Sequence, residues 1–227
     1  MDKLIYLMLF VIGTPISSAA EGSREVNVSS DEVQYSSDGT GAVFTGNVQV
    51  NAGGLQLQAT SLKVNSEGES RTYQANAGEQ TPLLLTCNDC ADFVIQADIQ
   101  KQAVFNDENN RLQLTGGLSV CADDACQRGK ITADSADWQQ QKLTLRGAPT
   151  VHGTWQLPET TETINMQAQQ VIYHLDTGEV ELAGDAQIER GGNTITGTAI
   201  HFNVNTGALK AESSTEQRVQ ATFGGDG

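Results

Sequence analysis

The 227-residue chain carries 28 acidic and 13 basic side chains, which gives a formal net charge of −15 at pH 7. This balance argues against nucleic-acid binding, because that function needs a basic surface that releases counterions. The length allows one large domain or two small ones, and internal repeats favour one because repeats share a continuous core.

Residues 1–20, MDKLIYLMLFVIGTPISSAA, have the organisation of an export signal. Lys3 precedes an apolar run from Leu4 to Ile12, and small residues lead to Ala20. This order predicts a secretory signal peptide that is cleaved after Ala20. A retained anchor is disfavoured, because a bilayer span needs about 20 apolar residues. We therefore expect an exported protein.

The pattern apolar-x-small-x-x-apolar-x-apolar recurs along the rest of the chain. It begins at Val28, Leu57, Ile131, Met166 and Ile195. A degraded copy begins at Ile95, with Gln100 and Gln102 where apolar residues are expected. Two apolar positions three residues apart break the strict alternation of a flat strand, so we predict a bulge or corner at each small residue.

A second pattern alternates with the first and places a glycine between two apolar pairs. The first example is AVFTGNVQV at residues 42–50, and RLQLTGGLSV, KLTLRGAPTV and EVELAGDAQI follow. Such a glycine marks a bend, which we expect at Gly46, Gly116, Gly147 and Gly184. Turn-forming stretches such as SSDGTG join the runs as hairpin loops do. Bent strands stacked unit on unit predict an all-β, elongated, two-walled structure around an apolar trough.

These strand pairs resemble those of the OstA-like, or LptA-type, periplasmic proteins of lipopolysaccharide transport. The resemblance is carried by AVFTGNVQV with LQATSLKVN and by VELAGDAQI with NTITGTAIHF, and similar patterning covers residues 26–213. It implies an OstA-like β-jellyroll with open ends. We expect this single domain over residues 21–222, after the signal peptide, and a disordered tail over 223–227. The four cysteines and the marked acidity depart from the family pattern.

The resemblance also implies a function, which is to carry lipopolysaccharide from the inner toward the outer membrane. The implied partners are lipopolysaccharide, membrane transport proteins with related domains, and further copies joined head to tail. Lipid carriage needs no catalytic group, and we expect no catalytic residue, no metal and no cofactor. The alternatives are a scaffolding β-repeat protein whose core is filled by its own side chains, and a carbohydrate-active β-solenoid enzyme. The enzyme is disfavoured because the outer strand faces lack matching clusters of acids.

Lipid carriage requires apolar shelter from several units at once. Burial contributes about 0.8 kcal/mol per methylene, so a chain of about a dozen carbons represents roughly 10 kcal/mol. We expect the acyl chains to contact a set of inward-facing residues contributed by all units. These are Val33, Tyr35, Phe44, Val48, Leu57, Leu62, Leu114, Leu118, Trp138, Leu145, Val171, Tyr173, Leu182, Ile188, Ile200 and Phe202.

We expect the four cysteines to form disulfides, because the protein is expected to be exported and an oxidising compartment favours disulfides. Cys87 and Cys90 flank two residues, and Cys121 and Cys126 flank four, so each pair can close its own hairpin. A crosslink between Cys90 and Cys126 is an alternative, because both lie five residues before the first apolar position of their units. Zinc fits the spacing but not the compartment. A redox centre lacks the helix N-terminus that lowers a thiol pKa.

His152, His174 and His201 have no nucleophile motif or metal-ligand spacing around them, so we expect solvated histidines. The stretch HGTWQLPETTET, residues 152–163, reads as an insertion between units. Its Trp155 is expected in a loop, either as a partner contact or as a local plug.

Overall fold

The computed structural model describes residues 26–52, 54–87, 95–123, 125–157, 162–213 and 218–224. The expected signal peptide, Cys90 and the last three residues of the expected tail lie outside these ranges. Within these ranges, sixteen strands form one antiparallel sheet. In chain order they are β1 (Val26–Ser29), β2 (Glu32–Tyr35), β3 (Gly41–Ala52), β4 (Leu55–Glu67), β5 (Ser70–Asn76), β6 (Leu83–Cys87), β7 (Ile95–Ile99), β8 (Gln102–Asn106), β9 (Arg111–Cys121), β10 (Gly129–Gln139), β11 (Lys142–Gln156), β12 (Thr163–His174), β13 (Glu179–Arg190), β14 (Asn193–Asn203), β15 (Leu209–Glu212) and β16 (Gln220–Thr222).

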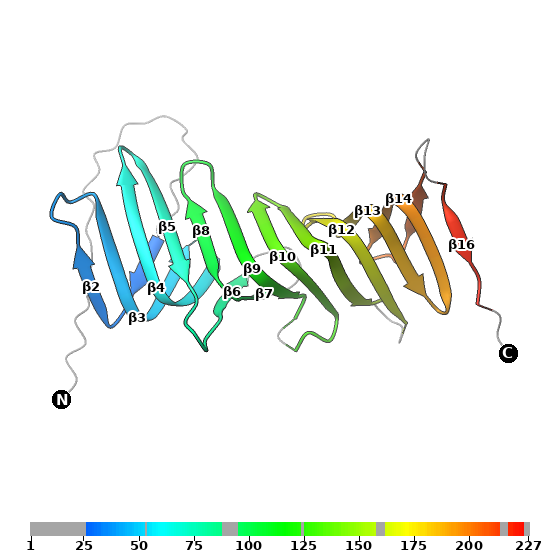
Figure 1. The fold of residues 1–227 in the computed structure, drawn as a ribbon, viewed down its shortest axis with the longest axis horizontal. Helices are drawn as coiled ribbons and strands as arrows, with labels where there is room; N and C mark the ends of the chain where they lie inside the picture. The colour runs from blue at the N-terminus through cyan, green and yellow to red at the C-terminus, as the bar shows by residue number, and fades with distance from the viewer. Residues whose placement is uncertain are drawn as a thin grey trace.

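The molecule is an elongated two-walled β-jellyroll, with β2 at one end of the body and β16 at the other (Figure 1). Each long strand contributes one half to each wall. The first half of β3 pairs with β2 and its second half pairs with β1, and β9 is shared in the same way between β8 and β7. We call the wall that contains β2, β5, β8 and β15 the A wall, and the wall that contains β1, β6, β7 and β16 the B wall.

The walls meet along a seam where the long strands bend. Pairing registers shift there, for example between Thr45 and Val48 in β3 and between Ala183 and Ala186 in β13. Gly46 and Gly184 lie inside these shifts with φ of 74°, a left-handed conformation that side chains other than glycine rarely adopt. Gly116 and Gly147 lie in the equivalent bends of β9 and β11. The four predicted bends are therefore confirmed.

The degraded repeat copy is accommodated by a break in the strand. β7 ends at Ile99 and β8 begins at Gln102, so Gln100 lies in the link and is exposed. Ile99 and Ala103 occupy the inward positions on either side and are 0% and 1% exposed. Ile99 pairs with Leu118 and Ala103 pairs with Leu114, so the inward positions on the two sides of the link lie four residues apart, whereas the equivalent Ala59 and Leu62 of β4 lie three apart.

The sequence predicts a loop over residues 152–163, and this prediction is wrong for most of the residues in that range that the structure describes. β11 continues to Gln156, and the Trp155 side chain is only 3% exposed. Val151, Gly153 and Trp155 alternate toward the core and continue the strand. The indole lies edge-on to the ring of Tyr173, with the ring centroids 6.1 Å apart.

Candidate functional site

The candidate site is the apolar trough between the walls, which is built from cross-strand rows. Inward-facing residues pair directly from strand to strand, so each row crosses twelve strands. At about 4.8 Å per strand a row extends roughly 50 Å. The outer A row contains Tyr35, Ala42, Val64, Tyr73, Phe105, Leu112, Trp138, Leu143, Tyr173, Val180, Phe202 and Leu209.

Two further rows run parallel to it. The inner A row, next to the seam, contains Val33, Phe44, Leu62, Ala75, Ala103, Leu114, Ala136, Leu145, Val171, Leu182, Ile200 and Ala211. The B row contains Val28, Val50, Leu57, Leu85, Ala97, Val120, Ile131, Gly153, Met166, Ile188, Ile195 and Ala221. No charged or polar side chain interrupts these rows except the Tyr hydroxyls and the Trp138 N–H.

The structure brings the sequence-predicted lining residues together on the inner faces. Fourteen of the sixteen belong to the three rows, and Val48 and Leu118 lie beside the seam. Most are buried in the core, and Phe44 and Leu57 are half-buried against it. Val33 and Tyr35 are 40% and 55% exposed, because β3 is the only strand in the described part of the chain that pairs with β2.

Sequence reasoning missed the contribution of β5 and β6. Tyr73 and Ala75 of β5, and Leu83 and Leu85 of β6, are all buried in the same core. Their alternation was visible in the sequence, but residues 77–82 interrupt the repeat between the two strands. Without a continuous bent strand, the unit does not match the repeat pattern.

The two halves of the trough differ in how tightly they close. In the C-terminal half, β10–β16, Leu145, Val171 and Leu182 are all 0% exposed. In the N-terminal half, β1–β9, several inward residues are only half-buried. The walls there enclose a cavity of about 40 Å³ with an entirely apolar lining. Its lining residues are Val26, Val50, Ala52, Leu55, Leu57, Leu62, Tyr73, Leu85, Ala103, Phe105 and Leu112.

Polar contacts occur at the rim of the C-terminal half, opposite the seam. The Arg190 guanidinium at the end of β13 donates to Glu162 Oε2 at 2.8 Å and to the Gly207 carbonyl at 3.2 Å. The hydrogen bond from Arg190 lowers the pKa of Glu162 and raises that of Arg190. Deeper in the trough, burial raises the pKa of the Tyr173 hydroxyl.

The rim of the B wall also carries the disulfides. Cys121 and Cys126 are bonded, with their Cα atoms 4.8 Å apart, which confirms this hairpin bridge and excludes the Cys90–Cys126 alternative. Cys87 is also disulfide-bonded. Inside the Cys121–Cys126 hairpin the Asp123 carboxylate accepts hydrogen bonds from the N–H groups of Ala125, Gln127 and Arg128.

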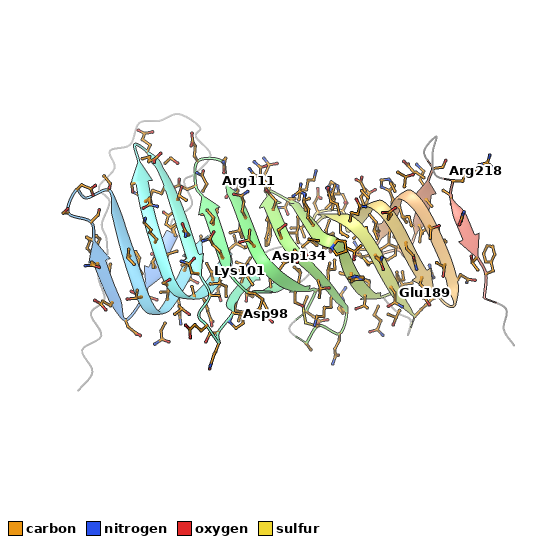
Figure 2. All side chains as sticks on the ribbon, in the orientation of Figure 1. Asp98, Lys101, Arg111, Asp134, Glu189 and Arg218 are labelled. Atoms are coloured by element: carbon orange, nitrogen blue, oxygen red, sulfur yellow. A yellow bond between two sulfur atoms is a disulfide. The ribbon has the colours of Figure 1, made fainter. Side chains whose placement is uncertain are left out.

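The six charged residues labelled in Figure 2 are all exposed. His201 faces outward from β14, 3.5 Å from Glu179 and 3.8 Å from Glu212. Among the described residues, no three His, Cys, Asp or Glu side chains gather in a way that would hold a metal ion. The same residues include no helix that is long and apolar enough to cross a membrane.

The two ends of the trough expose apolar side chains at sheet edges. Val33 and Tyr35 are exposed at β2, while Val219 and Phe223, which flank β16, are 40% and 78% exposed. Among the described strands, β2 pairs only with β3, and β16 pairs only with β14. Each end therefore offers unpaired strand edges beside exposed apolar groups.

Comparison with known proteins places this geometry in context. A family model described as LptA/(LptD N-terminal domain) LPS transport protein matches residues 27–208. Among solved structures, the chain is similar to LptH, the LptA homologous periplasmic component of the conserved lipopolysaccharide transport device from Pseudomonas aeruginosa. The two are 11% identical, with 89% of this chain and 96% of that chain covered and a TM-score of 0.34. No curated protein matches the sequence.

Proposed function

The chain belongs to the LptA/(LptD N-terminal domain) family of LPS transport proteins, and from this premise we propose that it is a periplasmic lipopolysaccharide carrier. Its trough shelters the acyl chains of the lipid A moiety, and the protein passes this cargo from the inner toward the outer membrane. The work is non-enzymatic. The acyl chains leave one apolar environment and enter another, so no covalent bond is made or broken.

The unbroken apolar rows carry this proposal. An acyl chain that fills one leaflet is about 15 Å long, half of the roughly 30 Å hydrocarbon core of a bilayer. It covers about three strands at 4.8 Å spacing, so the trough offers equivalent apolar positions along its whole length. A chain that slides from one strand to the next keeps the same kind of contacts, and no step requires exposure to water.

The N-terminal half is the proposed place of first binding. Phe44, Leu55 and Leu57 are only partly buried there and pack against the core. A cavity of about 40 Å³ has room for a few waters but not for an acyl chain, so the walls must separate to admit cargo. Half-buried side chains lose fewer packing contacts in such a movement than fully buried ones.

The edges of β2 and β16 are the proposed junctions with other carriers. An incoming strand that pairs with either edge satisfies its free backbone groups and covers the exposed apolar side chains. The apolar rows of two domains then join into one longer trough. We expect these edges to pair with related domains of partner proteins in both membranes and with further copies of this chain.

Displacement of an apolar fluorescent dye tests the carrier. Mature protein is expected to shift the dye emission, and purified lipopolysaccharide or lipid A at micromolar concentration is expected to reverse the shift. A second candidate is a structural β-repeat protein without lipid cargo, which the tightly filled C-terminal half favours. Absence of both the shift and the displacement supports this candidate and overturns the carrier.

A further inference from the structure

Arg190 occupies an unusual position in the B wall. The register pairs Gly129 with Trp155, Trp155 with Ile164, and Ile164 with Arg190 along one inward-facing row at the rim. The first three members are buried. Because side chains of one row point to the same side of a sheet, Arg190 is directed over the mouth of the trough and not toward the outer solvent.

The partner that it reaches belongs to the opposite wall. Gly207 lies in the loop between β14 and β15, and β15 pairs with the A-wall half of β14. Arg190 and Glu162 both belong to the B wall, at the rim ends of β13 and β12. The hydrogen bond of 3.2 Å to the Gly207 carbonyl therefore joins the two walls across the mouth, while Glu162 fixes the guanidinium at 2.8 Å.

Apolar packing accompanies this polar bridge. Leu157 of the B wall is 6% exposed and Val204 of the A wall is 1% exposed, although both lie at the rim. A Cβ placed on Gly207 would lie 3.1 Å from Leu157 Cδ2, so the two rims touch at this point. In the N-terminal half, no hydrogen bond between described residues joins the tips of the two walls.

We propose that Arg190, Glu162 and Gly207 form a clasp that holds the C-terminal mouth of the trough shut, and that acyl cargo passes this half only when the guanidinium leaves the Gly207 carbonyl. The proposal rests on the carrier function. A solvent-accessible ion pair suits this role, because such a pair contributes little net stability and breaks and re-forms easily. The wide fork of arginine allows it to hold a carboxylate and a carbonyl at the same time.

The clasp is testable without any lipid, by the distance between the two rims. Spin labels are attached through Asp176→Cys on the A wall and Thr163→Cys on the B wall, both at exposed positions near the clasp. In Arg190→Ala the distance distribution is expected to broaden and to shift to longer values. A second label pair, Glu69→Cys with Asn51→Cys, reports on the N-terminal mouth and is expected to stay unchanged.

Arg111→Ala is the matched control, because Arg111 pairs with Asp137 within the A wall alone. It removes an ion pair of the same kind without crossing the mouth, so the labels at the C-terminal rim are expected to keep their distances. Glu162→Gln keeps the bond to Gly207 and is expected to give an intermediate widening. An unchanged distance in both Arg190→Ala and Glu162→Gln overturns the clasp.

The gating role is measured by transfer of lipid A from one labelled carrier to another. Loss of an exposed ion pair is expected to raise the transfer rate of Arg190→Ala about two- to fivefold, with no change in Arg111→Ala. If the rims of Arg190→Ala move apart but its lipid A transfer rate is unaltered, the gating role is overturned, while the clasp between the walls is still supported. If the wild-type protein binds no lipid A, the carrier function fails, while the distance measurement still decides the clasp.

Discussion

Gly129 and Trp155 are partners across β10 and β11, and the Trp155 indole fills the space that any side chain at position 129 would need. Gly129→Ala is therefore expected to destabilise the protein by about 1–3 kcal/mol through overpacking. Urea unfolding measures the change. Adding Trp155→Phe frees space at the site, so Gly129→Ala is expected to cost less in that background. Equal costs in both backgrounds would show that the ring does not set the requirement for glycine.

The Cys121–Cys126 disulfide closes a short loop at the rim of the B wall. Replacing both cysteines with alanine is expected to lower the free energy of unfolding by about 2 kcal/mol, because a short loop loses little entropy on closure. The measurement is urea unfolding of the variant and the wild type under oxidising conditions. A loss of less than a few tenths of a kcal/mol would mean that the loop holds its shape without the bridge.

The same hairpin predicts a dependence of stability on pH. Burial of Asp123 tends to raise its pKa, but the hydrogen bonds from Arg128, Gln127 and Ala125 outweigh it, so the pKa lies below its ordinary value of 3.8. The folded state therefore binds this proton more weakly than the unfolded state. The resulting stability is present above pH 3.8 and is lost as the pH falls through the lowered pKa.

Asp123→Asn is expected to cost roughly 1–2 kcal/mol at neutral pH through weakened charge-assisted hydrogen bonds. The difference from the wild type should be constant between about pH 5 and 7 and should shrink as the pH falls below the ordinary value for Asp. Unfolding by urea at a series of pH values gives this profile. A difference that grows toward acid pH would contradict the assignment.

If copies of the chain assemble edge to edge, glutamate substitutions at two exposed valines should affect association differently. Val33 belongs to an inward row at the open edge, whereas Val43 faces outward from β3, and the two are similarly exposed at 40% and 38%. Val33→Glu is expected to prevent association, because it places a charge where two troughs would join. Val43→Glu is the matched control. Light scattering across a concentration series measures the mass, and equal association of both variants would exclude this edge.

The sequence allowed prediction of the rows because strict alternation and recurring glycines determine which side chains face inward. Gly46 and Gly184 are bends for the reason expected, namely a backbone conformation that suits glycine. The polar residues that follow Trp155 obscure its alternation with Gly153, so the sequence predicts a loop where β11 continues. The role of Arg190 cannot be predicted from the sequence, for another reason. Its role depends on the distance between two walls, and no periodicity within a strand carries that information.

Two neighbouring residues on one strand can show whether acyl chains lie between the walls. Leu57 faces the trough and lines the N-terminal cavity, whereas Gln58 faces outward on the same strand. A photoreactive side chain is placed at either position, lipid A is added, and adducts are detected by mass spectrometry. A lipid A adduct is expected from position 57 and none from position 58. Equal labelling from both positions, or labelling from position 58 alone, would show that acyl chains do not lie between the walls.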